Sequence, residues 1–558
     1  MNPRLVVKQV GSLLLLLAGL MALAAVAELF QFGHPKPVEG AEQAFVDESA
    51  VPAFALALLF NAGAGLLMFL VGRDPDAPPE LDAAREQGRA LNRDADERRG
   101  REVSFGRRDA MLLVGVAWVI GAATSALPFY LWALMRDVPE GVPEHPFQSF
   151  AMCYFEAVSG LTTTGATILG AFPNDIESLP AGLLLWRSML QWFGGLGIVV
   201  LFVAVLPVVG MGGKKLVSIE SSGGGQSVRP RIRQTVRTLW VIYACLTVAC
   251  GSLLWVTGMS LFDAICHTGT TVASGGFSPR NASIAAYYDL VGPTRAAALE
   301  WIIIFFMMMA GINFGLFYAA VNRRWMTLWR DSELRVYLLM LVSMTLAITL
   351  IIVDDPIILC SGAELEAGMT THLRQAAFTV VSLQTSTGYA SADFDLWPFA
   401  AQALLVVGMF AGGCAGSTAG GMKVIRLTTM FKVAWAELER AFRPHVVRPV
   451  RVNRQAIEPA AQLSVMAFAV MVVVTLVVAS ILLRILEPEA QLDITTTATA
   501  SIALLMNTGP GFHAVGPTQN FAFFSDPSLY VLSLLMVLGR LEMFALLVLL
   551  VPRFWRGN

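Results

Sequence analysis

The sequence is poor in charge. Asp, Glu, Lys and Arg make up only 14% of its 558 residues, whereas soluble proteins carry about 25%. Hydrophobic residues make up 56%, and the mean hydropathy is +0.63. Because so few charges cannot cover that much apolar surface in water, the composition excludes a soluble globular protein and indicates a membrane protein with many spans. The net charge of −2 gives no reason to expect a nucleic-acid partner.

The sequence also lacks the patterns of metal sites, disulfide frameworks and enzymes. Its six cysteines are scattered without a CxxC pair, and its six histidines lie far apart, which excludes the common metal-ligand spacings. We expect the histidines to be mostly solvated. There is no HExxH, no GxSxG and no acid pair on facing spans, so we predict no enzyme. No nucleotide-binding glycine motif is present either, so control by a nucleotide would need a separate cytosolic subunit.

Long apolar runs are the main positive feature. A membrane-crossing helix needs about 20 apolar residues. Ten runs reach or approach that length: 10–30, 51–72, 110–135, 182–209, 237–258, 296–321, 335–353, 396–411 with the glycine-rich stretch after it, 460–486 and 528–552. Four shorter runs lie between them, at 148–160, 260–272, 371–384 and 494–506. Runs of that length are too short to cross and are typical of re-entrant segments.

Basic residues set the predicted orientation. If the N-terminus is inside, alternate loops place 31 of the 39 Lys and Arg residues on the cytoplasmic side. The positive-inside rule then puts both termini in the cytoplasm and all four short runs on the outer side. In the first span, Arg4 and Lys8 precede an apolar core that ends at Ala25-Val26-Ala27, which resembles a signal-peptidase site. We favour an uncleaved helix, although cleavage would leave the later topology unchanged.

The order of span, short run and span occurs four times after residue 109, and each short run ends in a Thr- or Ser-rich turn with glycine. The turns are Thr162-Thr163-Thr164-Gly165-Ala166, Thr271-Val272-Ala273-Ser274-Gly275-Gly276-Phe277, Thr385-Ser386-Thr387-Gly388-Tyr389 and Asn507-Thr508-Gly509-Pro510-Gly511-Phe512. The glycines Gly165, Gly275, Gly388 and Gly509 are 110, 113 and 121 residues apart. One such turn would mean little, but four at near-equal spacing indicate a fourfold pseudo-symmetric array.

The predicted fold class is therefore an all-α polytopic membrane protein. Four pseudo-symmetric helix–pore-loop–helix repeats surround one pore, and two further transmembrane helices precede them. The expected divisions are 1–108 for the N-terminal helices and a cytoplasmic linker, then 109–212, 213–321, 322–432 and 433–558 for the four repeats. A transporter with rocking halves would typically show two inverted repeats instead.

The four turns have the chemistry of a cation filter. Each short helix runs inward, so the negative end of its dipole favours a cation near the membrane centre. Backbone carbonyls can replace the water shell of an ion, and glycine permits the dihedral angles that aim them. Such hard oxygen ligands suit alkali cations. The predicted filter residues are Thr163, Thr164, Gly165, Ala273, Ser274, Gly275, Ser386, Thr387, Gly388, Asn507, Thr508 and Gly509.

A second candidate site is the glycine-rich segment 412–421. Gly412, Gly416 and Gly420 could form a small-residue ladder for helix packing. Five glycines in ten residues make a continuous helix costly, at about 1 kcal/mol each relative to alanine. We therefore favour a broken helix that acts as a gate beneath the filter. The predicted gate residues are Gly412, Gly413, Gly416, Ser417, Thr418, Gly420, Gly421 and Arg540.

Four polar residues inside spans need an explanation. Arg540 lies near the middle of the last run, where an arginine costs about 2.5–3.5 kcal/mol, so we expect it to face pore water. Arg187 and Arg484 lie nearer the outer ends, and we expect them to extend toward the interface. Asn313 could either line the pore or bond a neighbouring helix.

These motifs resemble those of the TrkH potassium-uptake subunits. The resemblance covers essentially the whole chain. It is carried by Tyr154-Phe155-Glu156-Ala157 with the first turn, Trp186-Arg187-Ser188, Gln191-Trp192, Gly194-Gly195, Gly197-Ile198, Ser274-Gly275-Gly276-Phe277, Gly311-Ile312-Asn313-Phe314, Ser386-Thr387-Gly388-Tyr389 and Asn507-Thr508-Gly509-Pro510-Gly511. One departure is Ala273, where the resemblance leads us to expect serine.

The resemblance implies potassium uptake across a bacterial inner membrane, with K⁺ in the filter at Thr164, Ser274, Thr387 and Thr508 and no covalently bound cofactor. It also implies a homodimer, an intramembrane gate at 412–421 and a cytosolic TrkA-like nucleotide-binding ring. The basic segments 214–237 and 422–454 are candidate docking surfaces for that ring, although membrane topology alone explains their charge equally well. A less selective K⁺/Na⁺ channel and a proton- or sodium-coupled symporter remain alternatives.

Overall fold

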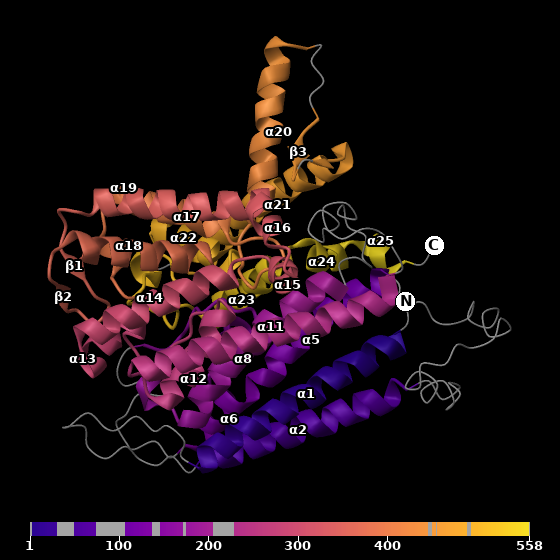
Figure 1. The fold of residues 1–558 in the computed structure, drawn as a ribbon. Coiled ribbons are helices and arrows are strands. Elements are labelled where there is room, and N and C mark those ends of the chain that lie inside the picture. The colour runs from indigo at the N-terminus through magenta and orange to yellow at the C-terminus, as the bar shows by residue number, and fades with distance from the viewer. Residues whose placement is uncertain are drawn as a thin grey trace.

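The computed structural model describes residues 3–30, 49–73, 107–136, 145–170, 175–204, 228–444, 449–453, 455–487 and 493–556. Within them, long helices run side by side through the body (Figure 1), with the two termini at one end and strands β1 (Ile357–Ile358) and β2 (Glu364–Leu365) at the other. Seven of the described helices are long and apolar enough to cross a membrane, or eight if one bent pair counts as a span. The predicted all-α polytopic fold class is confirmed.

The helices follow the expected order. The N-terminal pair is α1 (Pro3–Leu29) and α2 (Ala50–Val71). The first repeat contains α5 (Arg107–Ser125), α6 (Leu127–Met135), η2 (Pro146–Gln148), α7 (Phe150–Leu161), η3 (Ile176–Ser178) and α8 (Ala181–Ala204). The second contains α11 (Val228–Thr257), α12 (Leu261–Val272), η4 (Ser283–Ala286), α13 (Tyr287–Val291), α14 (Pro293–Ala310) and α15 (Phe314–Val321).

The later repeats carry additional short elements. The third contains α16 (Trp325–Arg330), α17 (Ser332–Ile351), the hairpin β1–β2, α18 (Met369–Gln384), η5 (Phe394–Leu396) and α19 (Phe399–Ala411). Helix α20 (Val424–Phe442) crosses the expected boundary at residue 432, and the hairpin of β3 (Arg451–Val452) and β4 (Gln455–Ala456) follows it. The fourth contains α21 (Pro459–Leu486), α22 (Ile494–Leu505), η6 (His513–Val515), α23 (Asp526–Arg540), α24 (Phe544–Leu547), η7 (Val548–Leu550) and α25 (Pro552–Trp555).

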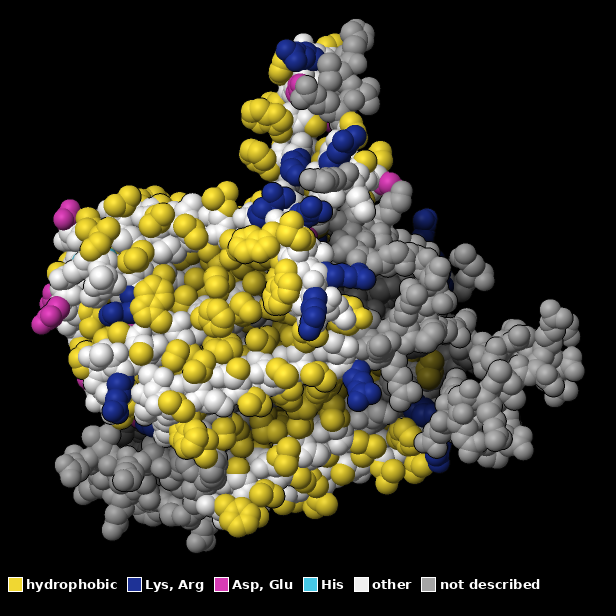
Figure 2. Space-filling model, viewed as in Figure 1, with side chains coloured by type: hydrophobic (Ala, Val, Ile, Leu, Met, Phe, Trp, Pro, Cys, Tyr) yellow, Lys and Arg dark blue, Asp and Glu magenta, His cyan; other side chains and the backbone are white. Residues whose placement is uncertain are grey.

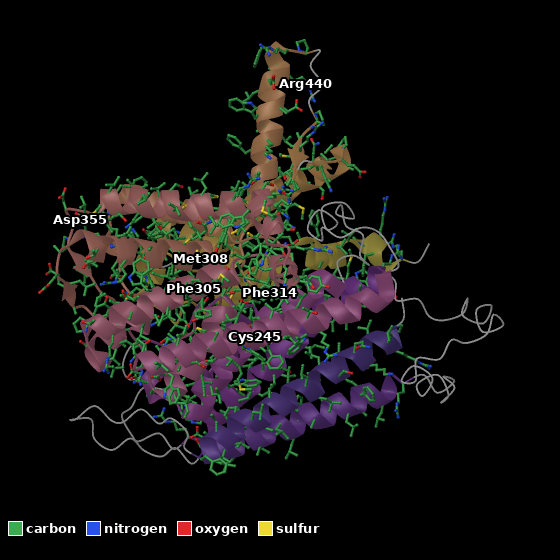
Figure 3. The ribbon with its side chains drawn as sticks, in the orientation of Figure 1. Cys245, Phe305, Met308, Phe314, Asp355 and Arg440 are labelled. Atoms are coloured by element: carbon green, nitrogen blue, oxygen red, sulfur yellow. The ribbon has the colours of Figure 1, made fainter. Side chains whose placement is uncertain are left out.

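The side chains on the surface fit a membrane environment. Figure 2 shows hydrophobic side chains spread over the visible face of the body, with Lys and Arg most frequent on α20 and towards the end that carries the termini. Asp355 marks the opposite end, beside β1, and Arg440 lies near the far end of α20 (Figure 3). Apolar surface of this extent is stable only where lipid or protein covers it.

The four short apolar runs fold as the short helices α7, α12, α18 and α22, as predicted. Three begin with a side-chain cap, in which Ser149, Ser260 or Asp493 accepts a hydrogen bond from a backbone N–H in the first turn. Partial burial acts to raise the pKa of Asp493, but hydrogen bonds from Thr496 lower it overall. The charged carboxylate therefore lies at the positive end of α22.

Three predicted spans are interrupted. The run at 296–321 breaks between α14 and α15, and the run at 396–411 ends at Ala411, with no helix until Val424. The prediction of a continuous last span to residue 552 is wrong. Helix α23 ends at Arg540, and the chain turns by 114° into the next helix because Glu542 and Met543 adopt positive φ angles. Arg540 is therefore the last residue of α23, not a residue in the middle of a long helix.

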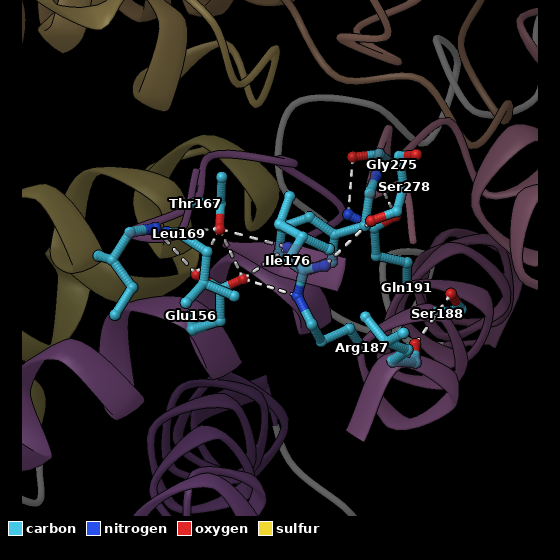
Figure 4. Close-up of polar contacts among 12 residues, drawn as sticks. Glu156, Thr167, Leu169, Ile176, Arg187, Ser188, Gln191, Gly275 and Ser278 are labelled. Carbon is cyan, nitrogen blue, oxygen red and sulfur yellow. Dashed lines mark hydrogen bonds and ion pairs between the residues drawn. The ribbon is translucent and has the colours of Figure 1, made fainter. Parts of the chain in front are cut away.

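Two expectations about polar residues are also wrong. Arg187 does not extend to the interface: its guanidinium is buried, lies 2.8 Å from the Glu156 carboxylate and bonds the Ser278 carbonyl at 3.1 Å (Figure 4). Arg187 on α8 faces the short helix α7, so its guanidinium finds a protein partner rather than water. The second wrong expectation is that the histidines are mostly solvated, since His145, His267 and His372 are buried.

The buried ion pair generates a stability prediction. Replacing Arg187 by Met should leave the Glu156 carboxylate buried and uncompensated, which costs about 3–5 kcal/mol. Thermal unfolding in detergent measures this loss. The matched control is Arg484→Met, because Arg484 is exposed and bonds only the Glu487 carbonyl; a change of about 0.5 kcal/mol or less is expected there. Equal effects of the two substitutions would contradict a stabilising ion pair.

Candidate functional site

The four glycine turns adopt the same backbone conformation. After each short helix and one capping residue comes a residue with positive φ, then a second residue, then a glycine with positive φ. The first positions are Thr163 (53°), Ser274 (56°), Ser386 (53°) and Asn507 (56°). The third positions are Gly165 (83°), Gly276 (79°), Gly388 (78°) and Gly509 (96°). Non-glycine residues rarely adopt positive φ, so four repeats of this pattern indicate one shared architecture.

This equivalence shifts the register of the second turn by one residue. Gly276, not Gly275, matches Gly165, and the four glycines are then 111, 112 and 121 residues apart. Ala273 is the capping residue of α12, equivalent to Thr162 after α7. Ala273 therefore precedes the three positions that make up the turn. The offset is not apparent in the sequence, because Gly275 and Gly276 stand next to each other.

The four turns close into a ring. A Cβ atom on Gly165 would lie 2.2 Å from the carbonyl oxygen of Gly275 in the second turn. The same clash occurs between Gly276 and Thr387 at 1.9 Å, between Gly388 and Thr508 at 2.0 Å, and between Gly509 and Thr164 at 2.6 Å. Each glycine thus packs on the second-position carbonyl of the next repeat, and the fourth repeat returns to the first. The turns therefore surround a single axis, and every one of them requires glycine.

The hydroxyl groups in the ring have different partners. The hydroxyls of Thr162 and Thr164 lie 2.7 Å apart, and those of Thr385 and Thr387 lie 2.8 Å apart. The Thr163 and Thr508 hydroxyls are buried without a hydrogen-bond partner in the described part of the chain. Buried polar atoms are almost always satisfied, so these two hydroxyls are exceptions among the turn residues.

Charged residues hold the ring from behind (Figure 4). Glu156 accepts hydrogen bonds from the Thr167 hydroxyl and the Ile168 N–H, just after the first turn. Arg187 links this carboxylate to the chain just after the second turn through the Ser278 carbonyl. Sequence reasoning missed this pair. The available signal was an acid in a short apolar run followed by an arginine in the next span.

The segment between α19 and α20 forms a non-helical loop beneath the ring. Its Thr418 hydroxyl lies 3.0 Å from the Ser274 hydroxyl, and the Gly420 N–H donates to Ser386. The Gly421 N–H donates to the Met506 carbonyl at 3.0 Å. The loop therefore contacts the ends of the second, third and fourth short helices. Because it is not helical, the small-residue ladder is excluded as an explanation of its glycines.

The predicted gate residues divide into two groups. Within the loop, Thr418, Gly420 and Gly421 lie directly beneath the ring, whereas Gly412, Gly413, Gly416 and Ser417 form its base. At the base, the Gly413 carbonyl accepts from Val424, the Gly416 carbonyl accepts from Phe314 at 3.1 Å, and Ser417 bonds the Cys414 carbonyl. The Gly412 and Gly421 backbones are close enough that a Cβ on Gly421 would lie 2.6 Å from the Gly412 Cα atom.

Arg540 joins this loop to the first repeat. Its Nη1 donates to the Thr418 carbonyl at 2.8 Å, and its Nη2 donates to the Gly194 carbonyl at 3.3 Å. The guanidinium is buried rather than exposed to water, with Nε unpaired in the described residues. The Asn313 side chain caps α15 by accepting from the Gly315 N–H at 2.7 Å, and it lies against Gly416 of the loop.

Comparisons with known proteins agree with this architecture. Residues 135–556 match a family described as TrkH: Cation transport protein. The "Trk system potassium uptake protein TrkH" of Salmonella typhimurium is 37% identical over 452 residues, covering 80% of this chain and 86% of the relative. The protein of the same name from Halomonas elongata is 35% identical over 512 residues, covering 90% and 92%.

A solved structure is similar over the full length. The crystal structure of the potassium transporter TrkH from Vibrio parahaemolyticus superposes with a TM-score of 0.77 at 30% identity, covering all of both chains. Together with the family match, this similarity shows that the chain belongs to the TrkH family.

Proposed function

We propose that the protein mediates potassium uptake through the ring of four turns. The observation that carries the proposal is the cyclic packing of each glycine on a carbonyl of the next repeat. Four second-position carbonyls are thereby held around one axis, where oxygens can replace the water shell of a cation. The short helices end at these turns, so their negative dipole ends also favour a cation there. The names of the similar proteins include potassium, which supports K⁺ as the ion.

The loop 412–421 is the proposed gate. It lies under the ring, and its contacts with the short helices are hydrogen bonds rather than helix packing. A flexible glycine-rich loop can leave such a position at modest cost, so a partner that binds the open state more tightly can shift the population. Arg540 contributes in two ways: it tethers the loop through Thr418, and its positive charge opposes a cation in a low-dielectric environment.

A cytosolic nucleotide-binding ring of the TrkA type is the proposed partner, and α20 is its proposed docking element. Helix α20 starts directly after the loop and stands off the body (Figure 1). Four exposed apolar side chains line one of its faces: Phe431, Trp435, Leu438 and Phe442. Of the other candidate segment, 214–237, residues 214–227 lie outside the described part of the chain.

The beginning of α20 is well placed to move the gate. Glu333 accepts hydrogen bonds from Ala415 in the loop at 2.7 Å and from Ile425 in α20 at 3.1 Å. Arg426 of α20 pairs with Glu542 at the bend after Arg540. A force on α20 would therefore reach both sides of the loop. The proposal also includes a homodimer in a bacterial inner membrane, with both termini cytoplasmic and the repeat divisions given above.

Rubidium and sodium uptake into liposomes tests the proposed filter. The parent protein should take up Rb⁺ in preference to Na⁺. Gly165→Ser should reduce this preference by about tenfold or more, equivalent to about 1.4 kcal/mol, because a Cβ there collides with the Gly275 carbonyl. Gly368→Ser is the matched control, since nothing lies within 4 Å of its Cβ position and its φ of 178° suits any residue. An unchanged preference in folded Gly165→Ser protein would refute the filter assignment.

The same assay tests the tether at Arg540. Arg540→Ala should raise basal Rb⁺ flux per folded protein severalfold, because the loop loses its bond at the Thr418 carbonyl and the path loses a positive charge. Arg540→Lys keeps the charge but loses the paired donors, so an intermediate flux is expected. Arg553→Ala removes an exposed arginine and should change nothing. Unchanged or lower flux in folded Arg540→Ala protein would argue against a closed gate held by Arg540.

A further inference from the structure

The second turn differs from the other three in a way that points to another residue. The second position of the ring is occupied by Thr164, Thr387 and Thr508 in the first, third and fourth turns, but by Gly275 in the second turn. The dihedral angles do not require this glycine, because Gly275 has no left-handed φ. The space does require it: a Cβ on Gly275 would lie 2.4 Å from both Cδ and Oε1 of Gln191.

Gln191 occupies the space that a side chain would fill in the second turn. It comes from α8 of the first repeat, is fully buried, and uses both ends of its amide. Nε2 donates to the Gly275 carbonyl at 2.7 Å, and Oε1 accepts from the Phe277 N–H at 3.1 Å. The two hydrogen bonds hold the backbone at Gly275 and at Phe277, on either side of Gly276. In the first and third turns, by contrast, the threonine hydroxyl at the second position bonds the threonine hydroxyl at the capping position.

The Gly275 oxygen is one of the four ring carbonyls, and it is the one that packs on Gly165. A carbonyl that accepts a short, buried hydrogen bond is fixed in position, and one of its lone pairs is engaged. Selectivity in a carbonyl filter depends on the spacing and the field strength of its oxygens. We propose that Gln191 is a positioning residue that determines ion selectivity by holding the Gly275 carbonyl in the ring. This inference rests on the proposed filter function.

The alternative is that Gln191 only fills the core behind the turn. Packing alone predicts that a side chain of similar size restores the parent behaviour. Positioning predicts that the amide donor itself matters. The two explanations therefore differ in the ratio of Rb⁺ to Na⁺ uptake, which does not depend on the amount of folded protein.

The test uses three changes in the full-length protein in liposomes. Gln191→Glu keeps an acceptor for Phe277 but loses the donor to Gly275, and Gln191→Leu loses both. Each should lower the Rb⁺/Na⁺ uptake ratio by about tenfold. Gln462→Leu is the control and should keep the parent ratio, because the Gln462 side chain on α21 bonds the Ile457 carbonyl just before that helix.

The outcomes separate this inference from the function on which it rests. Positioning is supported if Gln191→Glu loses selectivity while the parent and Gln462→Leu remain selective. This conclusion holds even if Gln191→Leu does not fold. A selective parent whose Gln191→Glu and Gln191→Leu variants keep the same ratio overturns the role of Gln191 and leaves the filter intact. A parent that takes up Na⁺ as readily as Rb⁺ overturns both.

Discussion

The contact between a glycine in one turn and a carbonyl in the next is the constraint on which the rest of the site depends. At each of these four positions, an added Cβ atom would lie only 1.9 to 2.6 Å from the neighbouring carbonyl oxygen, so no side chain fits. The contact requires the four short helices to end at the same depth. It also requires rigid support from behind, which the buried pair of Glu156 and Arg187 supplies for the first two turns. The ring is thus defined by steric limits and is closed only when all four repeats are present.

The repeats depart from the fourfold pattern in the region beneath the ring, where a gate would have to act. The third repeat interrupts its second long helix with the loop between α19 and α20, which lies beneath the ring, and the fourth bends sharply after Arg540. Positive charge gathers there: Lys423 is buried and bonds the Ala419 carbonyl at 2.7 Å, and Arg426 lies near Glu542. Lys423 is thus held by a backbone carbonyl of the loop itself, and Arg426 by a carboxylate at the bend. Such a contact set breaks at lower cost than a packed helix and suits a two-state element.

Sequence patterns predicted the features that depend on local composition. Short apolar runs gave the four short helices, and five glycines near residue 415 gave the break after α19. Features that depend on a partner far along the chain were missed. Hydropathy alone cannot distinguish Arg187 at an interface from Arg187 paired with Glu156, and it cannot detect the bend that Glu542 and Met543 make through positive φ. The glycine doublet at Gly275 and Gly276 set the wrong register, because only the neighbouring turns reveal which glycine meets a carbonyl.

Locating a bound cation tests the central claim most directly. Crystals of the protein grown with Rb⁺ and measured at the rubidium absorption edge would show bound ions by anomalous scattering. The ring geometry predicts a peak on the axis enclosed by the carbonyl oxygens of Thr164, Gly275, Thr387 and Thr508. An ordered ring with Rb⁺ bound only elsewhere, or with an empty axis at concentrations that saturate uptake, would contradict it.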